Sequence, residues 1–193
     1  MTQSAKHADA YEVMLHEAVS EYYADPLGFT LAMFPWGKDD SALCAYKEPR
    51  KWQCEFLEWL GDEIRKRKFD GMTPVPAIRM AVSSGHGVGK GALAGMLTNF
   101  IMSTRPNAKG TVTANTATQL DDKTWAAIQW WCGLSLTGHW FERNSTILYR
   151  KGYRESWRVT PQTYLAGYVA LHPTGRERRT RVQKQNPMHG GPR

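Results

Sequence analysis

Hydrophobic positions in the first 70 residues recur at the spacing of a helix. Between residues 4 and 23 they form one face, made of Tyr11, Leu15, Ala18, Val19 and Tyr22. Between residues 49 and 68 a second face contains Trp52, Phe56, Leu57, Leu60 and Ile64. Asp25 followed by Pro26 is typical of a helix start, so a further helix is expected between these two runs. We therefore predict an N-terminal helical segment over residues 1–70.

The middle of the chain alternates between strand and helix patterns. Residues 77–83 form a short apolar run that predicts a buried strand, and residues 91–103 predict a helix. The same order repeats with a strand over 109–115 and a Trp-rich helix over 116–132. Because strands that alternate with helices usually run parallel, the fold class predicted here is α/β with a parallel sheet and flanking helices.

Composition changes towards the C-terminus. Two runs, 145–149 and 156–160, predict the arms of a β-hairpin and belong to a core that spans residues 71–163. The chain has a net charge of +7, and from Leu171 onward it holds six Arg or Lys residues against one Glu. We expect a basic, disordered tail over residues 164–193. Such a tail either contacts a polyanion or is simply solvated.

The cysteines and the apolar stretches exclude several classes of protein. Cys44, Cys54 and Cys132 form no CxxC pair, so neither a disulfide framework nor a zinc site is indicated. No signal peptide precedes the first helix, and no run of about 18 apolar residues is present. We therefore expect a cytoplasmic protein with no membrane partner.

Candidate chemistry lies in the glycine-rich stretch "SGHGVGKG" between the first predicted strand and its helix. A loop of this kind at a helix N-terminus directs backbone N–H groups at phosphate oxygens, and its lysine reaches the outer phosphates. The predicted site consists of Ser84, Gly85, His86, Gly87, Val88, Gly89, Lys90 and Gly91. A merely structural glycine turn is the alternative. His86 is either a phosphate contact or a spacer that points to solvent.

Two departures from the GxxxxGK[ST] pattern bear on catalysis. Ser84 replaces a glycine, which is a mild change. Gly91 replaces the Ser or Thr whose hydroxyl ligates Mg²⁺, so we expect Mg²⁺ binding to be weakened. Hydrolysis also needs an apolar strand that ends in an acid. None of the acids after Lys90 ends such a strand, and Asp121 and Asp122 lie at a predicted helix start.

Several segments together resemble the N-terminal ATPase region of a tailed-phage terminase large subunit. They are "DPLGF", "PRKWQCEFLEWLGDEI", "SSGHGVGKG", "STRP", "TANTATQL" and "ESWRV", and they cover residues 24–163 in the order of the family. That family is the motor that pumps DNA into a procapsid. The resemblance implies an incomplete P-loop NTPase-like sheet, ATP and Mg²⁺ as cofactors, and the cytoplasm of a bacterial host as the location. Double-stranded DNA, a small terminase subunit and the procapsid portal are the implied partners.

The resemblance also implies roles for single residues. Lys90 would contact the β- and γ-phosphates, and Gln53 would recognise the edge of the adenine. An ordinary polar helix residue is the alternative for Gln53. Thr116 and Gln119 would couple the nucleotide state to DNA movement, with N-capping as the alternative for Thr116.

The likeness stops after residue 163, and residues 164–193 contain neither the family's acidic strand nor its nuclease domain. A truncated frame, such as a decaying prophage would carry, is therefore expected. The first hypothesis is an ATP-binding terminase fragment that hydrolyses ATP poorly or not at all, so whether it is an enzyme stays open. A second is a different P-loop enzyme such as a small kinase. A third is a non-enzymatic, basic nucleic-acid-binding protein with a vestigial P-loop.

Overall fold

The N-terminal part of the chain is helical, as predicted. A computed structural model describes residues 3–83, 85, 87–114 and 116–163. Its first three helices are α1 (Gln3–Glu21), α2 (Pro26–Met33) and α3 (Lys51–Arg67). Asp25 caps α2 by accepting the backbone N–H of Gly28 at 2.9 Å, which confirms the predicted helix start. None of the described helices is long and apolar enough to cross a bilayer.

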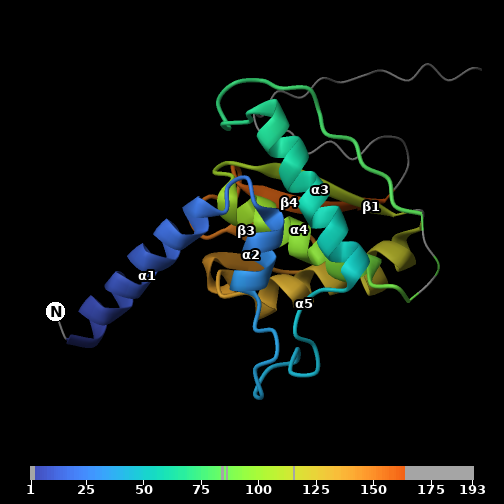
Figure 1. The fold of residues 1–193 in the computed structure, drawn as a ribbon. Helices are drawn as coiled ribbons and strands as arrows, with labels where there is room; N and C mark the ends of the chain where they lie inside the picture. Colours follow the sequence, from blue (N-terminus) through green and yellow to red (C-terminus); the bar gives the residue numbers. More distant parts are fainter. Residues whose placement is uncertain (1–2, 84, 86, 115, 164–193) are drawn as a thin grey trace, which may run out of the picture.

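A four-stranded mixed sheet lies behind the helices in the view of Figure 1. Its strands are β1 (Lys109–Ala114), β2 (Phe141–Arg143), β3 (Leu148–Arg150) and β4 (Arg158–Thr163). Their order is β1-β4-β3-β2, and only β1 and β4 are parallel. The predicted hairpin is confirmed as β3 and β4, with Leu148 opposite Val159. The α/β class is thus confirmed, but the expectation of a parallel sheet is only partly correct.

The predicted strand over residues 77–83 is wrong. This segment runs without a strand partner, and most of its side chains are exposed, including Val82 at 39%. The free edge of β1 carries no neighbour among the described residues either. An apolar run forms a buried strand only where other strands offer hydrogen bonds on its flanks. Within the described part of the chain no such strands stand beside it, so the segment remains extended chain.

Helix α4 (Lys90–Thr104) contacts α1, α2 and α5 (Ala126–Leu134), and it supplies much of the core. Figure 1 shows it in green between α3 and the sheet. Its fully buried side chains include Met96, Phe100 and Met102. Polar residues on the same helix are also buried, and Ser103 and Asn99 both hydrogen-bond the Thr137 hydroxyl. These bonds fix the turn that follows α5.

Two glycines let α4 approach α5 closely. A Cβ atom at Gly95 would stand 2.4 Å from the Cβ of Trp131, and one at Gly91 would stand 3.2 Å from that of Ala127. The two glycines are four residues apart, as are their partners, so each pair lies on one helix face. The predicted Trp-rich helix therefore packs backbone to backbone against the glycine face of α4.

The predicted helix over residues 116–132 begins with a wider turn. A π-helical segment, η1 (Gln119–Trp125), precedes α5. Leu120 and Trp125 are both buried, although they are five positions apart. An α-helix would separate such residues by about 140° around its axis, whereas the wider π-turn brings both side chains inward. The demand to bury both residues therefore accounts for the irregular turn.

A buried arginine ties the end of α4 to the connection between α1 and α2. The guanidinium of Arg105 lies 3.5 Å from the centre of the Tyr23 ring and donates to the Tyr23 carbonyl and the Thr104 hydroxyl. Burial lowers the pKa of Arg105 to about 10. The ring face and the two oxygen acceptors thus compensate for the loss of water around this charge.

Helix α1 extends away from the domain (Figure 1), and it is attached both by the buried side chains of Leu15 and Val19 and by a polar cluster around Trp140. His16 stacks on Trp140 at 4.1 Å between ring centres, and its Nε2 atom lies 3.3 Å from the Arg150 guanidinium. Glu12 accepts hydrogen bonds from the Trp140 indole at 2.8 Å and from His139 at 2.6 Å. Burial and the charge of Arg150 lower the pKa of His16. The Trp140 and His139 hydrogen bonds lower the pKa of Glu12.

These shifts predict how stability depends on pH. The pKa of His16 is lower in the folded chain than in the unfolded chain, so the folded state binds fewer protons and loses stability as pH falls below about 6.5. The contribution of Glu12 is lost only at more acidic pH. We expect the free energy of unfolding in urea to fall between pH 7.5 and 5.5, and His16→Gln to reduce that fall. An unchanged pH dependence in the variant would contradict the anchoring role of His16.

The glycine face of α4 predicts a second effect. Gly95→Ala should force α5 outward and lower the free energy of unfolding, because overpacking costs about 1–3 kcal/mol and outweighs the roughly 1 kcal/mol gained in helix propensity. Gly85→Ala, outside the helix, is a control for the added methyl group alone, since a Cβ there meets no atom within 4 Å. Thermal and urea unfolding would measure both. A stabilised Gly95→Ala protein would show that the helices are not held at this distance.

Candidate phosphate-binding site

The glycine loop leads directly into α4. Gly87 and Gly89 have φ angles of 74° and 93°, which side chains other than glycine rarely adopt. Gly89 is the N-cap of α4, and its carbonyl accepts the N–H of Leu93 at 3.1 Å. The predicted members Ser84 and His86 lie outside the described residues. The other predicted loop residues are thus brought together at the N-terminus of a 15-residue helix.

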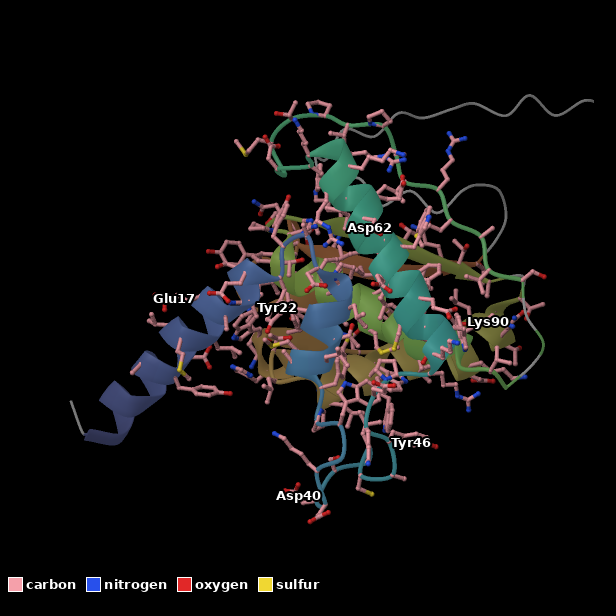
Figure 2. All side chains as sticks on the ribbon, viewed as in Figure 1. Glu17, Tyr22, Asp40, Tyr46, Asp62 and Lys90 are labelled. Atoms are coloured by element: carbon pink, nitrogen blue, oxygen red, sulfur yellow. The ribbon has the colours of Figure 1, made fainter. Side chains whose placement is uncertain are left out.

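Lys90 lies on the exposed side of this loop, at the opposite side of the domain from α1 (Figure 2). Its ammonium group donates to the carbonyl of Gly85 at 2.7 Å. The side chain therefore spans the loop from its end to its beginning. An anion that sits over the loop would meet this ammonium group directly.

Gln53 comes to the same loop from α3. Its amide Nε2 donates to the Gly89 carbonyl at 2.8 Å, and its Oε1 accepts the backbone N–H of Arg50 at 2.9 Å. The side chain is only 3% exposed. The structure therefore brings Gln53 next to the loop, where the contacts that it makes are to backbone groups.

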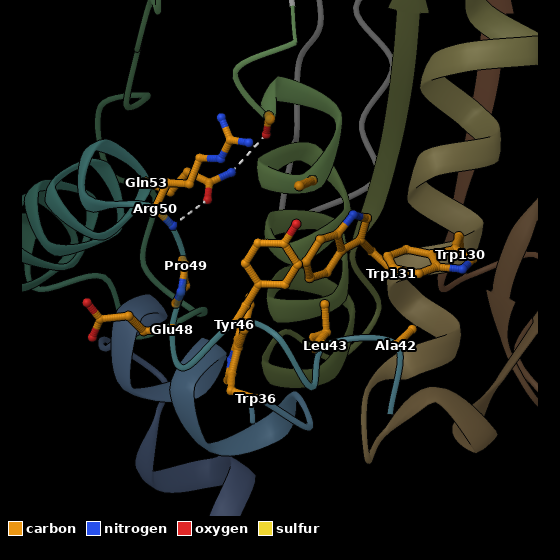
Figure 3. A pocket seen from close by; sticks show the side chains of 12 residues that line it. Trp36, Ala42, Leu43, Tyr46, Glu48, Pro49, Arg50, Gln53, Trp130 and Trp131 are labelled. Carbon is orange, nitrogen blue, oxygen red and sulfur yellow. Dashed lines mark hydrogen bonds between the residues drawn. The ribbon is translucent and has the colours of Figure 1, made fainter. Parts of the chain in front are cut away.

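A cavity of about 350 Å³ adjoins the loop (Figure 3). Four of its twelve lining residues are aromatic, and the lining consists of Trp36, Ala42, Leu43, Tyr46, Glu48, Pro49, Arg50, Gln53, Gly89, Ala92, Trp130 and Trp131. Trp36 and Trp131 pack together with 5.8 Å between ring centres. Tyr46 is 54% exposed and Trp130 is 48% exposed, so both form the open rim. The cavity is an aromatic slot that ends at the first turn of α4.

The sequence pattern does not indicate that several of these residues line a cavity. Trp130 and Trp131 belong to the predicted Trp-rich helix, but as adjacent residues they cannot share one face of it. In the structure Trp131 packs against the core and Trp130 reaches the rim. Trp36 and Tyr46 belong to the connection between α2 and α3, which has no periodic pattern to indicate their direction. Only their proximity to Gln53 along the chain could have drawn attention to them.

The structure gives Gly91 a packing role. A Cβ there would stand 3.2 Å from the Cβ of Ala127, closer than ordinary van der Waals contact. Close approach to α5 therefore accounts for glycine at the position where a phosphate loop usually carries a hydroxyl. Nearby, the Thr116 hydroxyl accepts the N–H of Gln119 at 3.1 Å, which is the contact expected of a helix cap.

No cluster of three or more His, Cys, Asp or Glu side chains within the described residues could hold a metal ion. When the chain is compared with models of known protein families, with curated proteins and with solved structures, nothing matches. The resemblance to terminases therefore stays a prediction.

The packing of Gly91 predicts the result of restoring the hydroxyl. Gly91→Ser alone should lower the melting temperature, because the new side chain presses against Ala127. Adding Ala127→Gly should recover most of the loss. If the loop binds a nucleotide, the added hydroxyl would supply a Mg²⁺ ligand in this double variant, so Mg²⁺-nucleotide should bind more tightly than to Ala127→Gly alone. Thermal unfolding and calorimetric titration would measure the two effects. Equal stability of Gly91→Ser and the unmodified protein would contradict the packing role.

Proposed function

We propose that this chain binds a nucleoside triphosphate, with the phosphates on the loop of residues 85–91 and the base in the aromatic cavity. The observation that carries the proposal is the position of Gly89, which caps α4 and also lines the cavity. A ligand that placed an anion at this cap would have an apolar slot for a flat ring immediately beside it. Nucleotides combine these two chemical parts.

The phosphate end is supported by charge and backbone geometry. The N-terminus of α4 carries the positive end of the helix dipole and backbone N–H groups that no helical carbonyl satisfies. Lys90 adds a full positive charge at the same place, since its ammonium group already contacts the loop at Gly85. Gly87 and Gly89 leave the backbone open to close approach. Together these features favour a phosphate chain over a single carboxylate.

The base end is supported by the size and lining of the cavity. A volume of about 350 Å³ falls within the range of small-molecule sites, which are mostly apolar with a few polar groups. Tyr46 and Trp131 both line the cavity (Figure 3), so a ring that enters would meet aromatic side chains. Stacking of this kind favours planar heterocycles.

The sequence resemblance narrows the proposal to ATP and to the nucleotide-binding region of a DNA-packaging terminase large subunit. The proposal covers binding and does not extend to hydrolysis, because the sequence after Lys90 holds no apolar run that ends in an acid. The nucleic-acid-binding alternative depends on the basic residues after Leu171, which lie outside the described residues. No contact among the described residues supports this alternative, which stays a prediction.

Two variants separate the two ends of the ligand. Lys90→Ala should weaken binding of ATP and of pyrophosphate by roughly tenfold or more, because a charged hydrogen bond to phosphate is lost. Tyr46→Ala should weaken ATP by roughly tenfold and leave pyrophosphate unchanged, since only the stacked ring is lost. Titration calorimetry with Mg²⁺-ATP and with pyrophosphate would measure both.

The control for these titrations is Tyr153→Ala, which removes an exposed tyrosine away from the cavity lining. It should bind both ligands as the unmodified protein does. If neither ATP nor pyrophosphate binds to the unmodified protein, the proposal is wrong. If Tyr46→Ala weakens both ligands equally, the base lies elsewhere.

A further inference from the structure

The N-cap residue and the first turn of α3 grip the phosphate loop through three hydrogen bonds to consecutive carbonyls. Arg50 Nη1 lies 3.5 Å from the Gly87 oxygen, Trp52 Nε1 lies 3.1 Å from the Val88 oxygen, and Gln53 Nε2 lies 2.8 Å from the Gly89 oxygen. The arginine contact is the longest of the three. Each donor reaches across more than 30 positions of the chain. The grip thus joins a helix to a loop that is remote in sequence.

These bonds determine where the loop directs its N–H groups. A trans peptide places its carbonyl and the N–H of the next residue on opposite sides, and the described chain contains no cis peptide. Because the carbonyls of residues 87, 88 and 89 turn to α3, the N–H groups of Val88, Gly89 and Lys90 turn away from it. Successive N–H groups on one side of a glycine-containing turn form an anion-binding concavity.

The amide of Gln53 has a fixed orientation, and both its oxygen and its nitrogen are already hydrogen-bonded within the protein. The Arg50 N–H can bond only to the amide oxygen, and the Gly89 carbonyl only to the amide nitrogen. The two contacts therefore assign the positions of Oε1 and Nε2. Gln53 is also 3% exposed. A Cβ at Gly89 would stand 2.9 Å from Nε2, so glycine is needed for this approach.

We infer that Gln53 and Trp52 are positioning residues, which hold the phosphate loop in its anion-binding shape, and that Gln53 does not recognise the edge of the base. The expected effect of Trp52 and Gln53 on nucleotide affinity rests on the proposed function. Their effect on the shape of the loop does not depend on any ligand. Loss of the grip should weaken every phosphate ligand by the same factor, whatever base it carries.

The ligand experiment compares ATP, GTP and pyrophosphate in calorimetric titrations. Trp52→Phe removes the indole N–H and keeps an aromatic ring, while Gln53→Met keeps the length of the side chain without its polar atoms. Each variant should weaken all three ligands by the same factor, on the order of tenfold for a lost part-buried hydrogen bond. Weaker ATP binding with unchanged pyrophosphate binding would overturn the inference and restore base recognition by Gln53.

Trp59→Phe is the matched control. Trp59 lies on the same helix and is 44% exposed, so the identical substitution there removes an indole N–H without touching the loop. All three affinities should remain unchanged. A loss equal to that of Trp52→Phe would mean that the effect arises from α3 as a whole and would overturn the positioning role.

A second experiment needs no ligand. Trypsin can cut after Lys90, where the loop enters α4, and after Arg79 in the exposed segment before it, and both residues are exposed. In Trp52→Phe and Gln53→Met, cleavage after Lys90 should accelerate on the order of tenfold relative to cleavage after Arg79, while Trp59→Phe should leave the ratio unchanged. An unchanged ratio in both loop variants would overturn the inference even if nucleotides bind.

The two experiments distinguish the possible failures. If the unmodified protein binds neither ATP nor pyrophosphate but the cleavage ratio rises in the variants, the grip exists and the proposed function fails. If the unmodified protein binds nucleotide and the ratio stays constant, the proposed function stands and the inference fails. Should Gln53→Met not fold, Trp52→Phe carries both measurements.

Discussion

The close approach of α4 and α5 constrains the rest of the domain. Helix α4 touches α1, α2, α5 and the π-turn η1, so its distance from α5 sets the room available to each of them. Glycines at positions 91 and 95 permit that distance, because neither carries a Cβ atom that would collide with Ala127 or Trp131. Trp131 can then turn its ring towards Trp36 and form one wall of the aromatic cavity.

The glycine loop before α4 contacts helices on two sides. Trp52 and Gln53 of α3 bond its carbonyls, and Ala127 of α5 lies against its last glycine. The strand expected to lead into such a loop does not form, so the extended segment over residues 77–83 contributes no hydrogen-bond ladder. Side chains that are distant in sequence therefore supply the order that a sheet would otherwise give. At this site, contacts made by side chains take the place of the backbone hydrogen bonds of a sheet.

Local patterns predicted the helices and the hairpin because the signals for them are short in range. The Asp25 cap, the apolar spacing in α3 and the alternation in β4 each depend on residues a few positions apart. Strand pairing depends on partners elsewhere in the chain, so the pattern of residues 77–83 could not show that none would be found. The π-turn was also missed, since the demand to bury Leu120 and Trp125 together exists only in three dimensions. Similarly, nothing in the sequence indicates that Arg105 would be buried against the Tyr23 ring. At the site, the glycine loop and Gln53 were found by motif, whereas Trp36 and Tyr46 came together through packing.

The unpaired segment over residues 77–83 has a consequence for the survival of the protein in a cell. Proteases and chaperones bind their targets as extended chain with accessible apolar side chains, and most folded proteins offer such chain only when they open. This segment offers it in the folded state, with Val82 exposed and no ladder to break first. Degradation can therefore begin without global unfolding. Cleavage within these seven residues would then be governed by their local exposure and not by the stability of the core.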